Sequence, residues 1–148
     1  MPENESLITR INPVYGDDTA HRILIVDDDK QLAGFLVELL RSLSGVVQTE
    51  VASDGFEAGQ KLQAFRPHTV LLDLMMPGIS GFDVCRKIKE NPETRGTRVV
   101  MTGYYTPENM MKAMEAGAEA CLAKPLDKTR LFNVIVLGGI EKITNIYS

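Results

Sequence analysis

The chain has 148 residues, which is the usual size of a single compact domain. Its composition, 44% hydrophobic and 24% charged, is that of an ordinary globular protein and excludes a disordered or fibrous chain. The formal net charge of −4 argues against nucleic acid as a direct partner, because phosphate backbones attract basic surfaces.

Residues 1–21 contain Pro2, Pro13, Gly16 and an Asp17-Asp18 pair, with only the short apolar pair Leu7-Ile8 before Ile11, and this pattern predicts a flexible N-terminal arm. The predicted domain covers residues 22–139 and is built from five repeats of a strand followed by a helix. The predicted strands are 23–26, 46–51, 69–72, 98–101 and 120–123, and the helices that follow them are 31–43, 56–65, 82–88, 110–114 and 131–137.

Two glycines, Gly138 and Gly139, are expected to end the last helix. The apolar residues beyond them predict a short C-terminal extension, residues 140–148, that packs against this domain, a second copy or an output domain. The alternation of strands and helices predicts an α/β fold with a doubly wound, five-stranded parallel sheet, buried on both faces.

Polar residues stand at the carboxyl ends of the predicted strands, where ligands bind in such folds. These residues are Asp27, Asp28 and Asp29 after the first strand, Asp73 after the third, Thr102 after the fourth and Lys124 after the fifth. Asp29 directly precedes a helix and is expected to cap it. Converging carboxylates repel one another and favour a bound cation, and an all-oxygen ligand set favours Mg²⁺. Carboxylates, Mg²⁺, a lysine and a hydroxyl together indicate phosphoryl transfer onto an aspartate.

These residues resemble the receiver domain of two-component response regulators, of the chemotaxis-regulator type. The resemblance rests on the sequences at 25–29, 72–81, 101–103 and 117–126, and it extends over about 22–139. It implies a flavodoxin-like (βα)5 fold with strand order 2-1-3-4-5.

The resemblance implies that Asp73 accepts a phosphoryl group from a sensor histidine kinase or a histidine phosphotransfer protein. It also implies a Mg²⁺ ion bound by Asp28, Asp73 and the backbone carbonyl of Met75, with Asp27 acting through a water molecule. A receiver promotes only its own phosphorylation and dephosphorylation, so it is not expected to be an enzyme. Its conformational change would control a downstream protein or an output domain, and a homodimer is left open.

Thr102, Gly103 and Lys124 match the family positions that bind the phosphoryl group, with Thr102 moving as the switch. The family often has an aromatic residue three positions before the lysine, but Cys121 stands there in this chain. Tyr104 or Tyr105 is a candidate to take over part of that role.

Cys85 and Cys121 form no metal or dithiol motif, and the chain starts without a secretory signal, so we expect reduced thiols in a cytoplasmic protein. No apolar run is long enough to span a membrane, so no membrane partner is expected.

Two other functions remain as alternatives. One is a receiver that is not phosphorylated and serves as a protein interaction module. The other is a haloacid-dehalogenase-like phosphatase, which would need its catalytic aspartate on the first strand and a threonine shortly after an Asp-x-Asp motif. Lys30 and Gln31 follow Asp29 instead.

Overall fold

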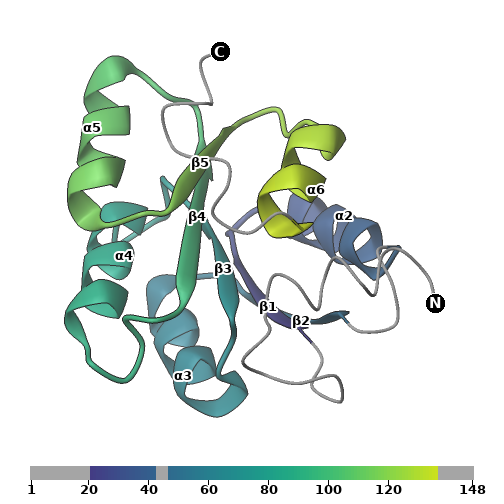
Figure 1. Ribbon diagram of the computed structural model, residues 1–148, viewed down its shortest axis with the longest axis horizontal. Coiled ribbons are helices and arrows are strands. Elements are labelled where there is room, and N and C mark those ends of the chain that lie inside the picture. The colour runs from purple at the N-terminus through teal and green to yellow at the C-terminus, as the bar shows by residue number, and fades with distance from the viewer. Residues whose placement is uncertain (1–20, 43–46, 137–148) are drawn as a thin grey trace.

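The computed structural model describes residues 21–42 and 47–136. Within these residues, parallel strands lie in the order β2-β1-β3-β4-β5, and helices cover both faces of the sheet (Figure 1). The strands are β1 (His21–Val26), β2 (Val47–Ala52), β3 (Thr69–Asp73), β4 (Arg98–Gly103) and β5 (Ala120–Ala123), and the helices are α2 (Lys30–Arg41), α3 (Gly55–Phe65), α4 (Gly81–Glu90), α5 (Pro107–Ala116) and α6 (Lys128–Val136). The predicted doubly wound fold and its strand order are confirmed.

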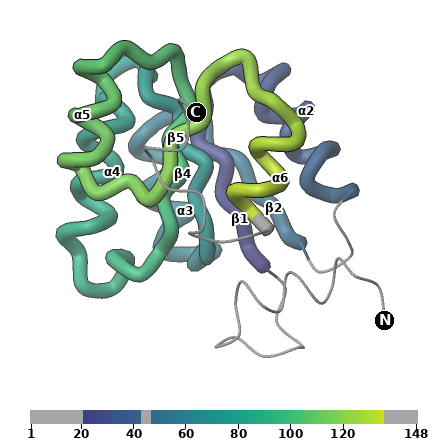
Figure 2. Tube along the Cα trace, turned by 45° about the horizontal axis from the view of Figure 1, so that its top comes forward, coloured from purple at the N-terminus to yellow at the C-terminus, as the bar shows by residue number. Residues whose placement is uncertain are grey.

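The sheet separates two layers of apolar side chains. Successive residues of a strand point to opposite faces, so Leu24 and Val26 join the core beneath α3, α4 and α5. Ile23 and Ile25 instead join the core beneath α2 and α6, which lie together on the other face (Figure 2). Burial on both faces explains the continuous apolar runs at residues 23–26 of β1 and 70–72 of β3. The edge strand β2 is mostly half-buried and carries Gln48 and Glu50.

Polar caps set where the helices begin. Asp29 accepts a hydrogen bond from the backbone N–H of Leu32 at 3.0 Å, so the predicted cap of α2 is confirmed. Thr106 caps α5 in the same way, and Pro107 follows at the start of the helix. α5 therefore begins at Pro107, three residues before the predicted start at residue 110. Apolar spacing identifies only the residues of a helix that face the core, so it misses the polar first turn.

β1 begins at His21, a residue that the sequence had assigned to the arm. The remaining arm residues, residues 43–46 and the extension 140–148 lie outside the described residues. In the described part of the chain, no helix combines the length and the apolar character that crossing a bilayer requires.

Two stacked histidines lie at the base of the sheet, with ring centroids 5.3 Å apart. The Nε2 atom of His21 lies 3.1 Å from the hydroxyl of Thr69, and Nδ1 of His68 accepts the backbone N–H of Arg22 at 2.8 Å. Burial, followed by repulsion from His68 and nearby arginines, lowers the pKa of His21 to about 3. Burial and the charge of Arg22 lower the pKa of His68 to about 4.

This histidine pair is expected to make the protein less stable as the pH falls. Below pH 6.5 both histidines become protonated in the unfolded chain, whereas in the folded chain His68 is protonated only near pH 4 and His21 only near pH 3. The free energy of unfolding therefore decreases as the pH falls through that range. Between pH 7 and pH 5 the free energy of unfolding should fall by about 2–4 kcal/mol, as measured by denaturant titration. The variant His21→Gln/His68→Asn keeps hydrogen-bonding atoms at similar positions and should lose most of this slope. An unchanged slope would contradict the prediction.

Candidate functional site

Three carboxylates converge at the carboxyl edge of the sheet. Asp27 directly follows β1 and Asp73 ends the neighbouring strand β3, while Asp28 lies beside them on the surface. Carboxylate oxygens of the three residues lie within 4.8 Å of one another. Asp27 and Asp73 are only 2% and 4% exposed, whereas Asp28 is exposed. The convergence expected from the sequence is present.

Lys124 places a cation between the two buried carboxylates. Its Nζ atom lies 3.1 Å from Oδ2 of Asp27 and 3.2 Å from Oδ1 of Asp73. The backbone N–H of Lys124 donates to the carbonyl of Gly103 at 2.8 Å, which fixes the lysine to the end of β4. One ammonium group therefore serves two carboxylates that come from different strands.

The charges at this edge are not fully balanced. Burial, and then repulsion from Asp27, raise the pKa of Asp73 although Lys124 opposes the shift. Burial acts to lower the pKa of Lys124, but Asp27 and Asp73 outweigh it and raise that pKa. Lys124 therefore stays positively charged, and the carboxylates retain excess negative charge that a second cation would offset.

Local backbone contacts hold the two buried carboxylates in place. The backbone N–H of Asp29 donates to Oδ1 of Asp27 at 2.9 Å, in the turn that leads into α2. The backbone N–H of Met75 donates to Oδ1 of Asp73 at 3.3 Å, while the side chain of Met75 points into solvent. Both carboxylates are oriented by the residue two positions further along the chain.

The loop after Asp73 packs tightly against its neighbours. The N–H of Leu74 donates to the carbonyl of Thr102, and the N–H of Gly81 donates to the carbonyl of Leu74. A Cβ atom on Gly81 would overlap the backbone carbonyl of Asp73. Gly81 is the last residue of the 72–81 motif, and this close approach to the backbone of Asp73 is the physical reason for a glycine there.

Thr102 lies next to Asp73, because the two residues are partners in the parallel pairing of β3 and β4. Thr102 is buried, and Gly103 follows it at the end of the strand. The structure thus gathers Asp27, Asp73, Thr102, Gly103 and Lys124 at one edge.

Cys121 is fully buried and lies opposite Met101 in the pairing of β4 and β5. Burial raises the pKa of its thiol to about 11, against a hydrogen bond from Tyr105. Tyr105 packs half-buried on the same apolar cluster, whereas Tyr104 is 73% exposed. Of the two tyrosines considered from the sequence, Tyr105 is the one that contacts Cys121.

The donor set at this edge fits a hard divalent cation. Three carboxylates supply oxygen atoms only, and the exposed Asp28 leaves one side open to solvent, which suits an ion that keeps some of its water ligands. The residues present therefore fit Mg²⁺.

Comparison with known proteins gives a consistent result. The model of the response regulator receiver domain matches residues 23–136. The chain is 37% identical over 116 residues to the DNA-binding response regulator MtrA of Mycobacterium bovis, and 39% identical over 112 residues to the response regulator PleD of Caulobacter vibrioides. These matches cover 78% and 75% of this chain, but only 49% and 24% of the two relatives.

Two solved structures show the same similarity over nearly the whole length of their own chains. The signal receiver domain of a DNA-binding response regulator from Colwellia psychrerythraea 34H superposes with a TM-score of 0.74 at 38% identity, covering 77% of this chain and 94% of that one. The chemotaxis protein CheY4 of Vibrio cholerae superposes with a TM-score of 0.73 at 25% identity, covering 79% and 97%.

Proposed function

This chain belongs to the family of response regulator receiver domains, and we propose that it accepts a phosphoryl group on Asp73. The donor is a phosphohistidine on a sensor histidine kinase or a histidine phosphotransfer protein. The observation that carries the proposal is the buried Asp73 carboxylate, 3.2 Å from the Lys124 ammonium and grouped with Asp27 and Asp28. This is the arrangement that a nucleophilic carboxylate and a charge-stabilising cation require.

In the transfer, a carboxylate oxygen of Asp73 attacks the phosphorus atom. The new P–O bond forms as the P–N bond to the donor imidazole breaks, and the imidazole keeps that electron pair. Lys124 offsets negative charge on the phosphoryl oxygens, and the Thr102 hydroxyl donates a hydrogen bond to one of them. Asp28, Asp73 and the Met75 carbonyl would hold Mg²⁺, with Asp27 acting through water. Such an ion would supply charge neutralisation at the transferred phosphoryl group.

Phosphorylation adds negative charge where the carboxylates are already incompletely neutralised. The new phosphoryl charge then binds one arrangement of the β4 end, which carries Thr102, more strongly than the other, and this difference shifts the population between the two arrangements. Tyr105, in contact with Cys121, is positioned to follow that shift. The new arrangement controls a downstream protein or an output domain, and the domain itself acts as a phosphoacceptor and not as an enzyme on other molecules.

The organisation proposed for the chain is a receiver unit at residues 22–139, between an N-terminal arm and the extension 140–148. The family match at residues 23–136 supports these limits. The chain spans about half the length of MtrA and a quarter of the length of PleD. Two buried free thiols support a cytoplasmic location.

The proposal predicts Mg²⁺-dependent phosphorylation of one residue. Incubation with acetyl phosphate and Mg²⁺ should add one phosphoryl group in the intact mass spectrum, and chelation of Mg²⁺ should abolish the adduct. Asp73→Asn should show no adduct, because an amide is not a nucleophile of this kind. Asp54→Asn is a matched control, because Asp54 is an exposed helix cap and asparagine caps equally well.

Other outcomes would select other functions. No adduct on a folded protein that binds Mg²⁺, with a histidine phosphotransfer protein also failing as donor, would favour the interaction module. An adduct that persists in Asp73→Asn would place the acceptor elsewhere, and Asp27 on the first strand would be the next residue to test.

A further inference from the structure

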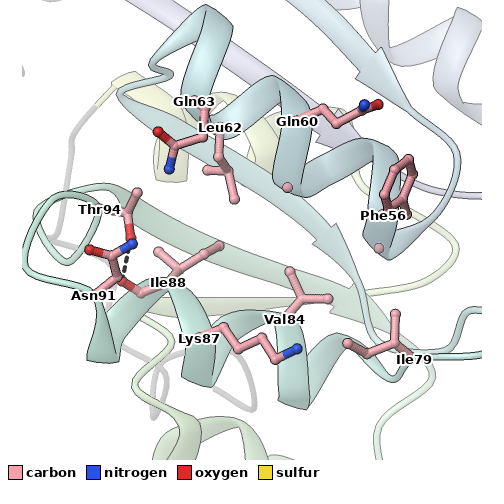
Figure 3. Close-up of a pocket in the computed structure, with 12 residues that line it drawn as sticks. Phe56, Gln60, Leu62, Gln63, Ile79, Val84, Lys87, Ile88, Asn91 and Thr94 are labelled. Carbon is pink, nitrogen blue, oxygen red and sulfur yellow. Dashed lines mark hydrogen bonds between the residues drawn. The ribbon is translucent and has the colours of Figure 1, made fainter.

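A groove runs between α3 and α4 (Figure 3). These two helices lie on the face of the sheet opposite α2 and α6 (Figure 1). It encloses about 520 Å³ and its surface is largely apolar, with Leu62 from α3 facing Val84 and Ile88 from α4. Phe56 stands at one end with 77% of its surface exposed. Phe56 extends the apolar surface of the groove, and a contiguous exposed apolar surface of this kind is typical of a site that binds a segment of protein.

Missing side chains on α3 keep this groove open. Gly55 and Gly59 line it one helical turn apart. A Cβ atom on Gly59 would meet no atom within 4 Å, so this stretch of the groove is open space. A glycine inside a helix costs about 1 kcal/mol relative to alanine, and α3 carries one where a side chain would begin to fill the groove.

The groove continues into a second, more polar hollow of about 230 Å³ at the base of the molecule. Leu62, Gln63 and Thr94 line both, which makes them one continuous surface. Arg22 and Arg66 line the basal hollow, and Nε of Arg22 donates to the carbonyl of Arg66 at 2.9 Å. Glu93 also lines this hollow, so two arginines against one glutamate give the basal end a net positive charge, while the end at Phe56 is apolar.

We propose that this surface binds the chain's own N-terminal arm, residues 1–20, which lie outside the described residues. The arm joins the domain at His21, next to Arg22 at the basic end of the surface. The ten residues 11–20 span up to about 33 Å when extended. The 11 residues of α3 are about 16 Å long, so the arm reaches the whole groove.

The order of residues in the arm matches the order of the surface. Asp17 and Asp18 precede His21, where the arm joins the domain, by four and three residues, and this length of chain can reach Arg22 and Arg66. The apolar residues of the arm come further from the join and fall along the apolar part of the groove; they are Leu7, Ile8, Ile11, Val14 and Tyr15. Complementary charge at one end and apolar contact along the rest fix one direction of binding.

The end of the groove furthest from the basal hollow is lined by a residue that lies close to Asp73 in the sequence. Ile79, in the loop between Asp73 and α4, lines the groove beside Gly55. A bound arm therefore contacts the loop that leaves the acceptor residue. The docking itself does not depend on phosphorylation, so it can be tested on the unmodified protein.

The test uses the full chain with a nitroxide spin label on Ser6→Cys. Cys85 and Cys121 are buried with raised thiol pKa values, so the label goes to the new cysteine. We expect loss of amide NMR signal intensity along α3 and α4, strongest near Phe56. Gly59→Leu should fill the groove and restore these signals. Gly34→Leu, at an equally open helical glycine of α2, should leave the loss unchanged.

Three outcomes would overturn the proposal. The first is an absence of signal loss on α3 and α4, and the second is a loss centred on α2 or α6. The third is signal loss in isotope-labelled chains that carry no nitroxide, when these are mixed with nitroxide-labelled chains that carry no isotope. That last result would assign the groove to a second copy.

Discussion

Lys124→Met is expected to slow phosphorylation of Asp73 by acetyl phosphate by about two to three orders of magnitude. Methionine has a similar length but no charge, so the variant removes the ammonium that lies 3.2 Å from Oδ1 of Asp73. Loss of one preorganised electrostatic contact to the moving group costs about this much in rate. The rate of adduct formation, followed by intact mass at saturating Mg²⁺, is the measurement.

The same substitution should lower stability in the absence of Mg²⁺. The side chain of Lys124 is 13% exposed, and its removal leaves the carboxylates of Asp27 and Asp73 buried without a counter-charge. The free energy of unfolding at pH 7 should fall by about 3 kcal/mol. The pKa of Asp73 is already raised by burial and by Asp27, so protonation at lower pH should recover part of this loss.

Lys112→Met is the matched control, because Lys112 pairs with Glu108 on the surface of α5 at 3.5 Å. Exposed pairs of this kind contribute about 0–1 kcal/mol, so rate and stability should stay near those of the unmodified protein. A folded Lys124→Met protein that is phosphorylated within twofold of the normal rate would show that Lys124 has no part in transfer.

Gly81→Ala is expected to destabilise the fold by about 2–3 kcal/mol, a large effect for one methyl group. The added Cβ would overlap the backbone carbonyl of Asp73 and would lie 3.0 Å from Cα of Leu74. Neither atom belongs to a flexible side chain, so the loop itself must shift. Since that loop carries Met75, which donates to Oδ1 of Asp73, we expect weaker Mg²⁺ binding as well.

Gly34→Ala serves as the control, because a Cβ atom on this glycine of α2 meets nothing within 4 Å. Alanine should there increase stability by up to about 1 kcal/mol, since it favours the helix. Denaturant midpoints for the two variants should therefore move in opposite directions. A shift of the denaturant midpoint with the same sign and size in both variants would mean that the close approach of Gly81 to the Asp73 carbonyl does not determine the effect of the substitution.

The strands could be predicted from sequence to within two residues at each end. Residues 23–26 of β1 and 70–72 of β3 are apolar at every position, so a short apolar run between polar residues identifies these strands. The convergence of Asp27 and Asp73 then follows from parallel strands that end at the same edge. The strand order came from the family resemblance, because apolar spacing alone does not say which strands are neighbours.

Contacts between distant elements could not be predicted in this way. The position of Lys124 at the same sheet edge predicts a contact with a resting carboxylate, but it does not show that one ammonium contacts both Asp73 and Asp27, which is 97 positions away in the sequence. The contact of Tyr105 with Cys121 depends on how the loop after β4 turns inward. The groove beside Gly59 depends on the distance between two helices. Each of these is decided by tertiary packing and not by local pattern.

The strand order also has a consequence for how a growing chain acquires its structure on the ribosome. The first three strands to be synthesised form one contiguous half of the sheet, β2-β1-β3, and β4 and β5 then add in turn to the same growing edge. Asp27 and Asp73 are therefore both translated before Lys124. Until Lys124 is added, the chain lacks the ammonium partner of these two carboxylates, so the last strand to be translated also brings the group that offsets their repulsion.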